Sequence, residues 1–396
     1  MTEPLIIGAM VRTLGAYPSG WRHPGAHRDP ATDAGILRRI AREGEDAGLD
    51  YLFFGDWLAT GPDLEFRDPY LLARIDPVSA VLFLAGVTSR IGLIATVNTT
   101  YADPYAAARS LASLDVLIDP EGLRPAAVEG AHLRVAGPLN VARPPQGRIP
   151  IVHAGTSPRS RALAATEADL ALIAAPTLVE AIATRRLLRD IAAEAGRSPD
   201  ELRVIAPVLP VVGDTDAAAK RIVQTLLALV PLAEGHQVAR PAFPPNRTIG
   251  ALADALDVSR EDPLREATFD ARVTTAEAER LGERGAALIE RLDRIAGLGV
   301  RTGDPLTWRH LVAAHAVPAA FVVGDAGTIA DHFELWRDEG AADGFNVLSA
   351  FQPAQFEAFT RIAAPELRRR GLLRSVAESQ GSTLRDRLRI SSYVDA

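Results

Sequence analysis

Short apolar runs alternate with longer helical patterns along most of this 396-residue chain. Runs such as Leu5–Val11 and Tyr51–Gly55 are continuously apolar, which is typical of parallel strands that are buried on both faces. Helical apolar spacing follows the first run at Asp33–Ala47, and Gly48 can end that helix. Repeated strand–helix units of this kind predict an α/β fold with a parallel sheet.

Seven strand candidates can be counted, whereas a closed βα barrel usually has eight. They begin near residues 5, 51, 91, 151, 170, 204 and 344. In a regular βα repeat, another strand and helix would lie between the run at 91 and the run at 151. Only the short stretch Asp119–Ala136 separates the helical segment Pro104–Ile118 from the approach to the next strand. The missing member of the repeat is therefore expected between residues 118 and 151.

The span Pro231–Ala319 interrupts the alternation of strands and helices before the last strand. It contains several prolines and charged helical stretches such as Thr275–Ile295. We interpret 231–319 as a helical insertion within a single domain that covers residues 1–396. An insertion at this place suits a lid or an oligomer contact, and an inert cover is an equal alternative.

Composition excludes several kinds of site and partner. The chain has no cysteine, which excludes disulfides, thiolate metal sites and cysteine nucleophiles. Its eight histidines show no metal-ligand spacing. The net charge of −7 argues against nucleic acid or an acidic membrane surface as the main partner. With neither a signal-peptide pattern nor an apolar run of roughly 20 residues, the simplest expected compartment is the cytoplasm.

Polar side chains follow two of the predicted strands. Asp56 comes after the run at 51, and Thr96, Asn98 and Thr99 come after the run at 91. Chemistry in parallel βα folds gathers at the carboxyl ends of strands, so these groups are candidates to bind the polar edge of a ring. The alternatives are that Asp56 caps the next turn and that the threonine-rich turn satisfies its own backbone.

A small-residue turn, Gly155-Thr156-Ser157, lies between the run at 151 and the next helix. Small residues let the backbone approach a ligand, and the free N–H groups of the helix suit a phosphate. The alternative is an ordinary serine N-cap with Pro158 at the first helical position. His23, in a Gly/Pro-rich loop after the first strand, is a candidate general base.

Together, these segments resemble the bacterial-luciferase-like flavin-dependent monooxygenases. The similar branch is that of nitrilotriacetate monooxygenase component A, dibenzothiophene-sulfone monooxygenase and pristinamycin synthase. The motifs that carry the resemblance are GWRHP (20–24), LFFGDWLA (52–59), TSRIGLIATVNTTYADPYAAARSLASLD (88–115), GPLNVARPPQGRIPIVHAGTS (137–157), GAADGFNVL (340–348), PELRRRGLLR (365–374) and STLRDRL (382–388). Their order and spacing along nearly the whole chain make the resemblance specific.

The resemblance implies a TIM-type (β/α) barrel and a specific chemistry. Members of the family use reduced FMN from a separate flavin reductase, together with O2, to oxidise a small organic substrate at carbon, nitrogen or sulfur, and they commonly dimerise. The flavin contacts of the family correspond here to Asp56, Thr96, Asn98, Thr99, Gly155, Thr156 and Ser157.

The chain departs from the family pattern where the fourth βα unit belongs. The helix that ends in SLDVLI runs directly into DPEGLRPAAVEGAHLRV, without the family's GWNxVTS-like strand and the helix that follows it. We interpret this as a deletion of the fourth unit, which leaves a barrel of seven strands or a distorted barrel and removes part of the flavin phosphate site. Family histidines also align with Ala16, Tyr17 and a position near Ala319.

Two hypotheses compete with an FMN-dependent oxygenase that acts on a secondary metabolite or xenobiotic. One is a flavin-independent descendant that catalyses a non-redox step, such as a cyclisation, elimination or isomerisation. The other is a non-catalytic partner subunit. The intact turns at 96–99 and 155–157 favour the oxygenase, whereas the missing unit favours the alternatives.

Overall fold

The structure of this chain is a computed structural model, which describes residues 3–27, 33–56, 58, 75–118, 127–129, 134–136, 148–233, 246–379 and 382–390. The Pro-rich approach predicted at 137–147 lies outside these residues. Among the described helices, none is both long and apolar enough to cross a lipid bilayer.

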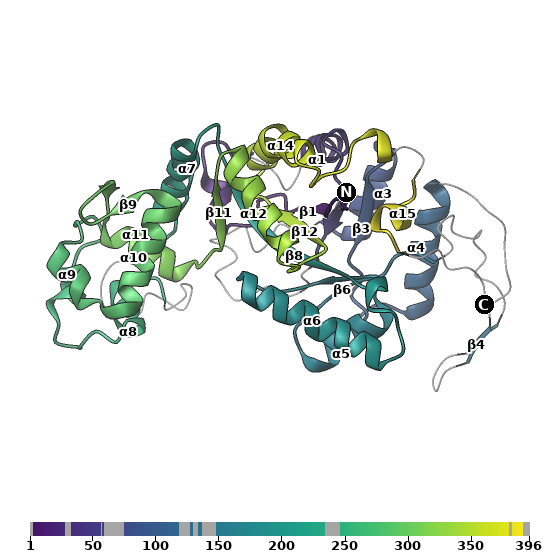
Figure 1. Ribbon diagram of the computed structural model, residues 1–396, viewed down its shortest axis with the longest axis horizontal. Coiled ribbons are helices and arrows are strands. Elements are labelled where there is room, and N and C mark those ends of the chain that lie inside the picture. Colours follow the sequence, from purple (N-terminus) through teal and green to yellow (C-terminus); the bar gives the residue numbers. More distant parts are fainter. Residues whose placement is uncertain are drawn as a thin grey trace.

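Eight parallel strands form a sheet that curves into a nearly closed barrel with helices around it (Figure 1). Seven of them follow the order β3-β2-β1-β12-β8-β7-β6. Their bounds are β1 (Ile6–Met10), β2 (Tyr51–Phe54), β3 (Gly92–Ala95), β6 (Val152–Ala154), β7 (Leu170–Leu172), β8 (Arg203–Val212) and β12 (Gly344–Leu348). All seven coincide with predicted runs, so the predicted barrel class is confirmed.

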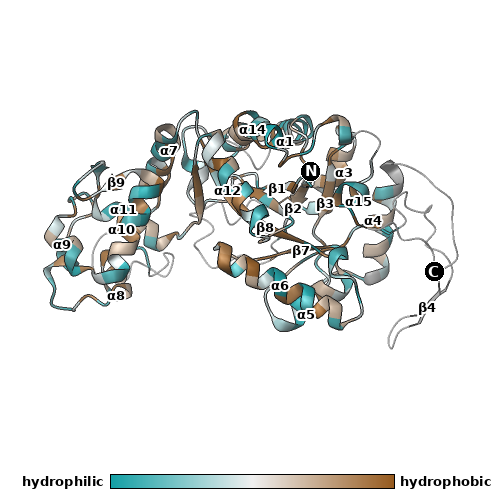
Figure 2. Ribbon diagram, in the orientation of Figure 1, coloured by the Kyte–Doolittle hydropathy of each residue, from teal (hydrophilic) through white to brown (hydrophobic). Residues whose placement is uncertain are grey.

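Helices cover the outer face of the sheet, and most of them begin with a side-chain cap. They are α1 (Ala34–Asp46), α3 (Pro77–Ala85), α4 (Pro104–Ile118), α5 (Pro158–Glu167), α6 (Leu178–Glu194), α7 (Asp216–Ala228), α12 (Ala326–Asp338), α13 (Ala354–Ala358), a π-helical turn (Phe359–Ala363) and α14 (Ala364–Arg369). Asp76 caps α3, where its carboxylate accepts a hydrogen bond from the Ser79 amide at 2.7 Å. In Figure 2 the strands are mostly brown, whereas the helices carry both teal and brown segments, as expected for helices that bury one face.

Strands β3 and β6 are the two ends of the seven-strand order, and none of the described strands joins them. The interval between them instead holds a short antiparallel hairpin, β4 (Ala127–Glu129) and β5 (Arg134–Ala136), which forms a separate two-stranded sheet among the described strands. This hairpin is not among the predicted elements. Within the described residues, the seven-strand order agrees with the predicted loss of the fourth barrel strand.

One strand of the sheet is absent from the prediction. Strand β11 (Phe321–Gly324) follows the predicted insertion directly and pairs with Leu209–Val212, the second half of β8. The first half of β8 pairs with β12. A strand of four residues, three of them hydrophobic, is too short to identify by its pattern alone, so its pairing with the unusually long β8 could not be foreseen.

The predicted insertion forms a helical lobe beside the barrel, at the left of Figure 1. It contains α8 (Ile249–Ala255), α9 (Thr275–Arg280), α10 (Gly282–Ala296), α11 (Trp308–Ala316) and the paired short strands β9 (Leu298–Gly299) and β10 (Asp304–Pro305). Its core, which includes Trp308 and Leu311, continues into Val211 on β8 and Phe351 after β12. This shared core supports the treatment of 231–319 as an insertion within one domain, which stays a prediction.

The chain's last described helix, α15 (Leu384–Leu388), closes the amino-terminal end of the barrel. Leu388 and Ile390 pack inside the barrel against Ile6, Tyr51 and Ile205. The guanidinium of Arg203 donates hydrogen bonds to the carbonyl oxygens of Leu388 and Arg389, at 3.3 and 2.6 Å. The floor of the barrel therefore comes from the far end of the sequence.

Candidate functional site

The carboxyl-terminal half of the barrel interior is open to solvent. Side chains of register partners in parallel strands point to the same face. Ala154 is the partner of Leu172, which packs in the barrel interior, and Pro207 is the partner of Asn346 in the same inward row as Gly8. Ala154 and Pro207 are both exposed, so solvent reaches the interior at this level.

Tyr51 forms the bottom of this open space. Its ring lies over Gly8, where an added Cβ would clash with the ring atoms. Burial, and next the charge of Asp50, raise the pKa of the Tyr51 phenol. Neither the Tyr51 hydroxyl nor Oδ1 of the buried Asn346 has a hydrogen-bond partner in the described structure. A buried polar atom without a partner costs about 1–3 kcal/mol, so Tyr51 and Asn346 are uncompensated polar groups beneath the open space.

The wall above Tyr51 is apolar and only partly buried. Phe53 and Ile94 are register partners that pack with the interior cluster, and Met10 is the partner of Phe53 on the other side. All three side chains are intermediate in exposure. An apolar wall with a few polar groups at its rim is the usual composition of a small-molecule site.

The predicted polar residues of β2 and β3 lie at neighbouring strand ends. The Thr96 amide donates to the Phe54 carbonyl oxygen at 3.1 Å, which brings the Asp56 and Thr96 segments together. The side-chain Oδ1 of Asn98 accepts from the Thr100 amide at 3.1 Å, as in the turn-forming alternative, and Thr99 is exposed. Contacts of these residues with a flavin stay a prediction.

The turn at 155–157 lies at the end of β6, across the interval that no described strand fills. Ser157 caps α5, and its Oγ accepts from the Ser160 amide at 3.2 Å. Ser160 Oγ also hydrogen-bonds His153 Nε2 at 2.7 Å. A Cβ on Gly155 would clash with Ser160 Oγ, so the glycine lets the turn pass close to the helix.

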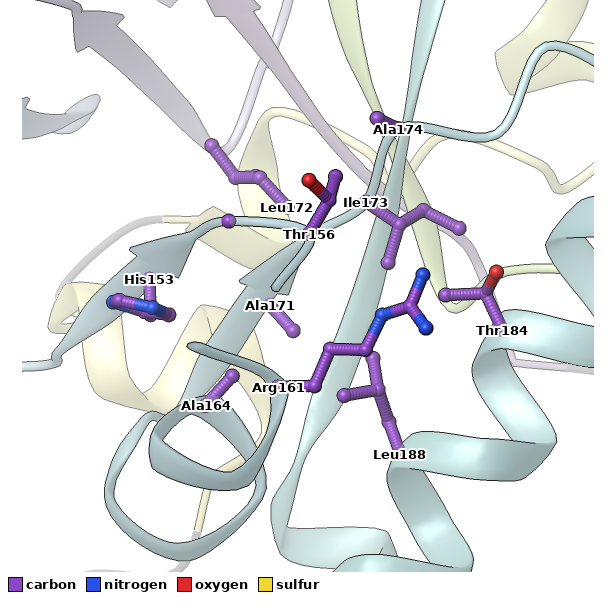
Figure 3. A pocket seen from close by; sticks show the side chains of 11 residues that line it. His153, Thr156, Arg161, Ala164, Ala171, Leu172, Ile173, Ala174, Thr184 and Leu188 are labelled. Atoms are coloured by element: carbon purple, nitrogen blue, oxygen red, sulfur yellow. The ribbon is translucent and has the colours of Figure 1, made fainter. Parts of the chain in front are cut away.

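A small pocket lies beside this turn (Figure 3). Its free volume is about 20 Å³, and it is lined by His153, Gly155, Thr156, Arg161, Ala164, Ala171, Leu172, Ile173, Ala174, Thr184 and Leu188. The guanidinium of Arg161 points toward Thr184 on α6 in Figure 3. Arg161 and Thr184 are not among the predicted site residues. The position of Arg161, one helical turn after Ser157, is the signal that could have revealed it.

His23 lies on the loop after β1 and stacks on Phe351, with ring centroids 4.0 Å apart. Its Nδ1 accepts a hydrogen bond from the Gly25 amide at 3.0 Å, and burial lowers its pKa. The neutral ring therefore carries its proton on Nε2. This geometry suits a hydrogen-bond donor better than the predicted general base, because the free nitrogen is the protonated one.

Comparison with known proteins agrees with this architecture. A family model described as luciferase-like monooxygenase matches residues 17–120 and 122–343. The chain is 30% identical to nitrilotriacetate monooxygenase component A of Aminobacter aminovorans, over 96% of this chain and 95% of that protein. It is 29% identical to dibenzothiophene-sulfone monooxygenase of Rhodococcus erythropolis, over 93% and 92% of the two chains. The crystal structure of DmoA from Hyphomicrobium sulfonivorans shares the fold, with a TM-score of 0.73 and 21% identity over 98% of this chain and 92% of that one.

The alignment with the nitrilotriacetate enzyme spans 457 positions, which is more than the 396 residues of this chain. That relative therefore carries residues that this chain lacks, which agrees with the loss of a βα unit. The matches cover nearly the whole chain and confirm the predicted class of protein, a flavin-dependent monooxygenase-like enzyme. The chain belongs to the luciferase-like monooxygenase family.

Proposed function

We propose that this chain is the oxygenase component of a two-component monooxygenase. It would bind reduced FMN from a separate flavin reductase and use O2 to oxidise a small organic substrate, either a xenobiotic or a secondary metabolite. Relatives that are named as one component or one subunit of a larger enzyme support a system of more than one protein. The observation that carries the proposal is the open barrel interior above Tyr51, where inward-facing Ala154 and Pro207 are exposed.

The groups around this space fit the two ends of FMN. The apolar wall of Met10, Phe53 and Ile94 suits a flat ring system, and Asn346 lies one row below it on the same inward face. The hydroxyls and guanidinium beside the turn at 155–157 suit a phosphate. When bound, reduced FMN would supply the electrons that activate O2.

The residues of the protein would bind the flavin, orient it and shield it from water. We assign Asp56, Thr96, Asn98 and Thr99 to the polar edge of the ring, and Gly155, Thr156 and Ser157 to the phosphate end. His23 would donate a hydrogen bond from Nε2 to the substrate, since its Nδ1 is already bonded to Gly25. The helical lobe at 231–319 would contribute to the substrate side of the site.

We further propose that the protein acts in the cytoplasm as a homodimer. The neighbouring exposed apolar side chains Leu82 and Phe83 on α3 support a contact between two copies of the chain, because contiguous exposed apolar surface marks association sites. Light scattering of the wild-type protein and of Leu82→Glu tests this contact. A monomeric wild type would contradict it.

The test of the proposed function begins with flavin binding. FMN is titrated by fluorescence quenching, and then O2 consumption is followed with NAD(P)H, FMN and a flavin reductase. Tight binding, with substrate-dependent incorporation of one oxygen atom, supports the oxygenase. An absence of binding at high micromolar FMN would contradict it. Thermal stabilisation by a small organic molecule without flavin would favour the non-redox alternative instead.

A further inference from the structure

We propose that Arg161 is the charged contact for the phosphate of the bound flavin, in the pocket beside the β6 turn. This inference rests on the proposed function, because it names a positioning residue of the same site. Neither the sequence motifs nor the family resemblance assigns a role to Arg161.

The pocket lies at the same edge of the sheet as the open barrel interior. It is built at the carboxyl ends of β6 and β7 and on the inner faces of α5 and α6. Its polar side chains are Thr156, Arg161, Thr184 and His153, and its other lining residues are apolar or glycine. No carboxylate lines it among the described residues, so its charge complements an anion.

Arg161 differs from the partly buried arginines on and just after α6, which are all paired with carboxylates. On α6, Arg185 pairs with Asp343 at 2.6 Å and Arg189 with the same carboxylate at 3.3 Å, and Arg197 pairs with Glu201. The half-buried guanidinium of Arg161 has no hydrogen bond or ion pair with the described residues. A partly desolvated cation without a counter-charge is costly, and a bound anion would remove that cost.

The small size of the pocket suits a terminal group of a ligand and not its ring system. A free volume of about 20 Å³ holds about one water-sized group, so it excludes a three-ring system and admits one terminal phosphate oxygen, with the rest of the phosphate outside the pocket. Thr156 belongs to the turn at the carboxyl end of β6, and Gly155 keeps that turn close to α5. A ligand with its ring above Tyr51 and a phosphate tail over the turn would reach Arg161.

The test compares FMN with riboflavin, which differ only by the phosphate. Kd values are measured by fluorescence quenching for the full-length wild type, Arg161→Gln, Arg161→Lys and the control Arg159→Gln. Arg159 is exposed, lies two residues away on the same helix and is absent from the pocket lining. Charge-assisted hydrogen bonds contribute about 1.5–3 kcal/mol. Arg161→Gln should therefore raise the Kd for FMN about 10- to 100-fold and leave the Kd for riboflavin unchanged. Arg161→Lys should give an intermediate loss, and Arg159→Gln a change within about twofold.

Equal weakening of FMN and riboflavin by Arg161→Gln, or no change in either, would overturn the inference while leaving the proposed function standing. If the wild type binds neither flavin, the proposed function fails, and inorganic phosphate then tests Arg161 by itself. Phosphate should raise the Tm of the wild type, relative to sodium chloride of equal ionic strength, and leave the Tm of Arg161→Gln unchanged. An equal rise in both proteins would overturn the role of Arg161.

Discussion

The guanidinium of Arg385, near the end of the described chain, donates hydrogen bonds to the carbonyl oxygen of Arg148 at 3.1 and 2.8 Å. Arg148 precedes β6, and Leu384, the neighbour of Arg385, contacts Gly92 on β3. Helix α15 therefore bridges the two strands that no described strand joins. The C-terminal segment holds together the part of the barrel where the described residues lack a βα unit.

Removal of the Arg385 side chain should destabilise the fold. Arg385 is 4% exposed and also lies 3.6 Å from the buried carboxylate of Asp169. Arg385→Ala would leave that carboxylate without its cation, so we expect the free energy of unfolding to fall by about 2–4 kcal/mol. Urea denaturation followed by circular dichroism measures it. The control Arg369→Ala, which breaks a surface ion pair with Glu366, should lower the free energy of unfolding by less than about 1 kcal/mol. Equal losses in the two variants would show that Arg385 does not stabilise the connection between β3 and β6.

A second prediction concerns the contact between Gly92 and Leu384. A Cβ on Gly92 would lie 2.5 Å from Leu384 Cδ1 and 3.0 Å from the Asp50 carbonyl oxygen. Gly92→Ala should therefore cost about 1–3 kcal/mol through overpacking. Leu384→Ala in the same chain should recover part of that loss, because it removes the nearer clash. A double-mutant cycle measures the recovery, and strict additivity would show that α15 does not rest on β3.

The turn at Gly155 should be sensitive to a single methyl group. Because a Cβ there would displace Ser160 Oγ, Gly155→Ala should break the hydrogen bond between Ser160 and His153 and reshape the turn. We expect FMN affinity to fall at least about tenfold, measured by fluorescence titration. Gly86→Ala is the matched control, since a Cβ there meets only the Phe83 carbonyl oxygen at 3.9 Å. Unchanged FMN affinity in Gly155→Ala would remove this turn from the site.

Stability should fall as the pH drops below neutrality, in part because of His332. Burial lowers its pKa to about 4, among the rings of Trp336 and Phe345. The folded state therefore favours the neutral ring, and this stabilisation is complete above pH 6.5 and lost as the pH falls toward 4. The loss amounts to at most about 3 kcal/mol. Urea denaturation from pH 7.5 to 4.5 should show that the free energy of unfolding depends less on pH in His332→Leu than in the wild type. An identical dependence in the two proteins would show that His332 does not contribute.

The sequence predicts the barrel strands well because their apolar runs are continuous, as in β12 at Gly344–Leu348. It does not reveal β11, because a four-residue strand carries no distinctive period and is defined by its pairing with β8. The polar turns after β3 and β6 are recognisable from local composition. Arg161 cannot be recognised from local composition. It stands out because its guanidinium has no partner among the described residues, and only the three-dimensional arrangement of α5 and α6 shows this.

The floor of the barrel has a consequence for how the chain is made. Strand β1 ends at residue 10, yet its partner β12 and the helix that closes the interior beneath it begin at residues 344 and 384. At about 5–20 residues per second, a ribosome takes roughly 20–80 s to synthesise the intervening chain. Throughout that time β12 and α15 are not available to cover the inner faces of β1 and β2. The nascent protein therefore depends on chaperones or on slow folding after release.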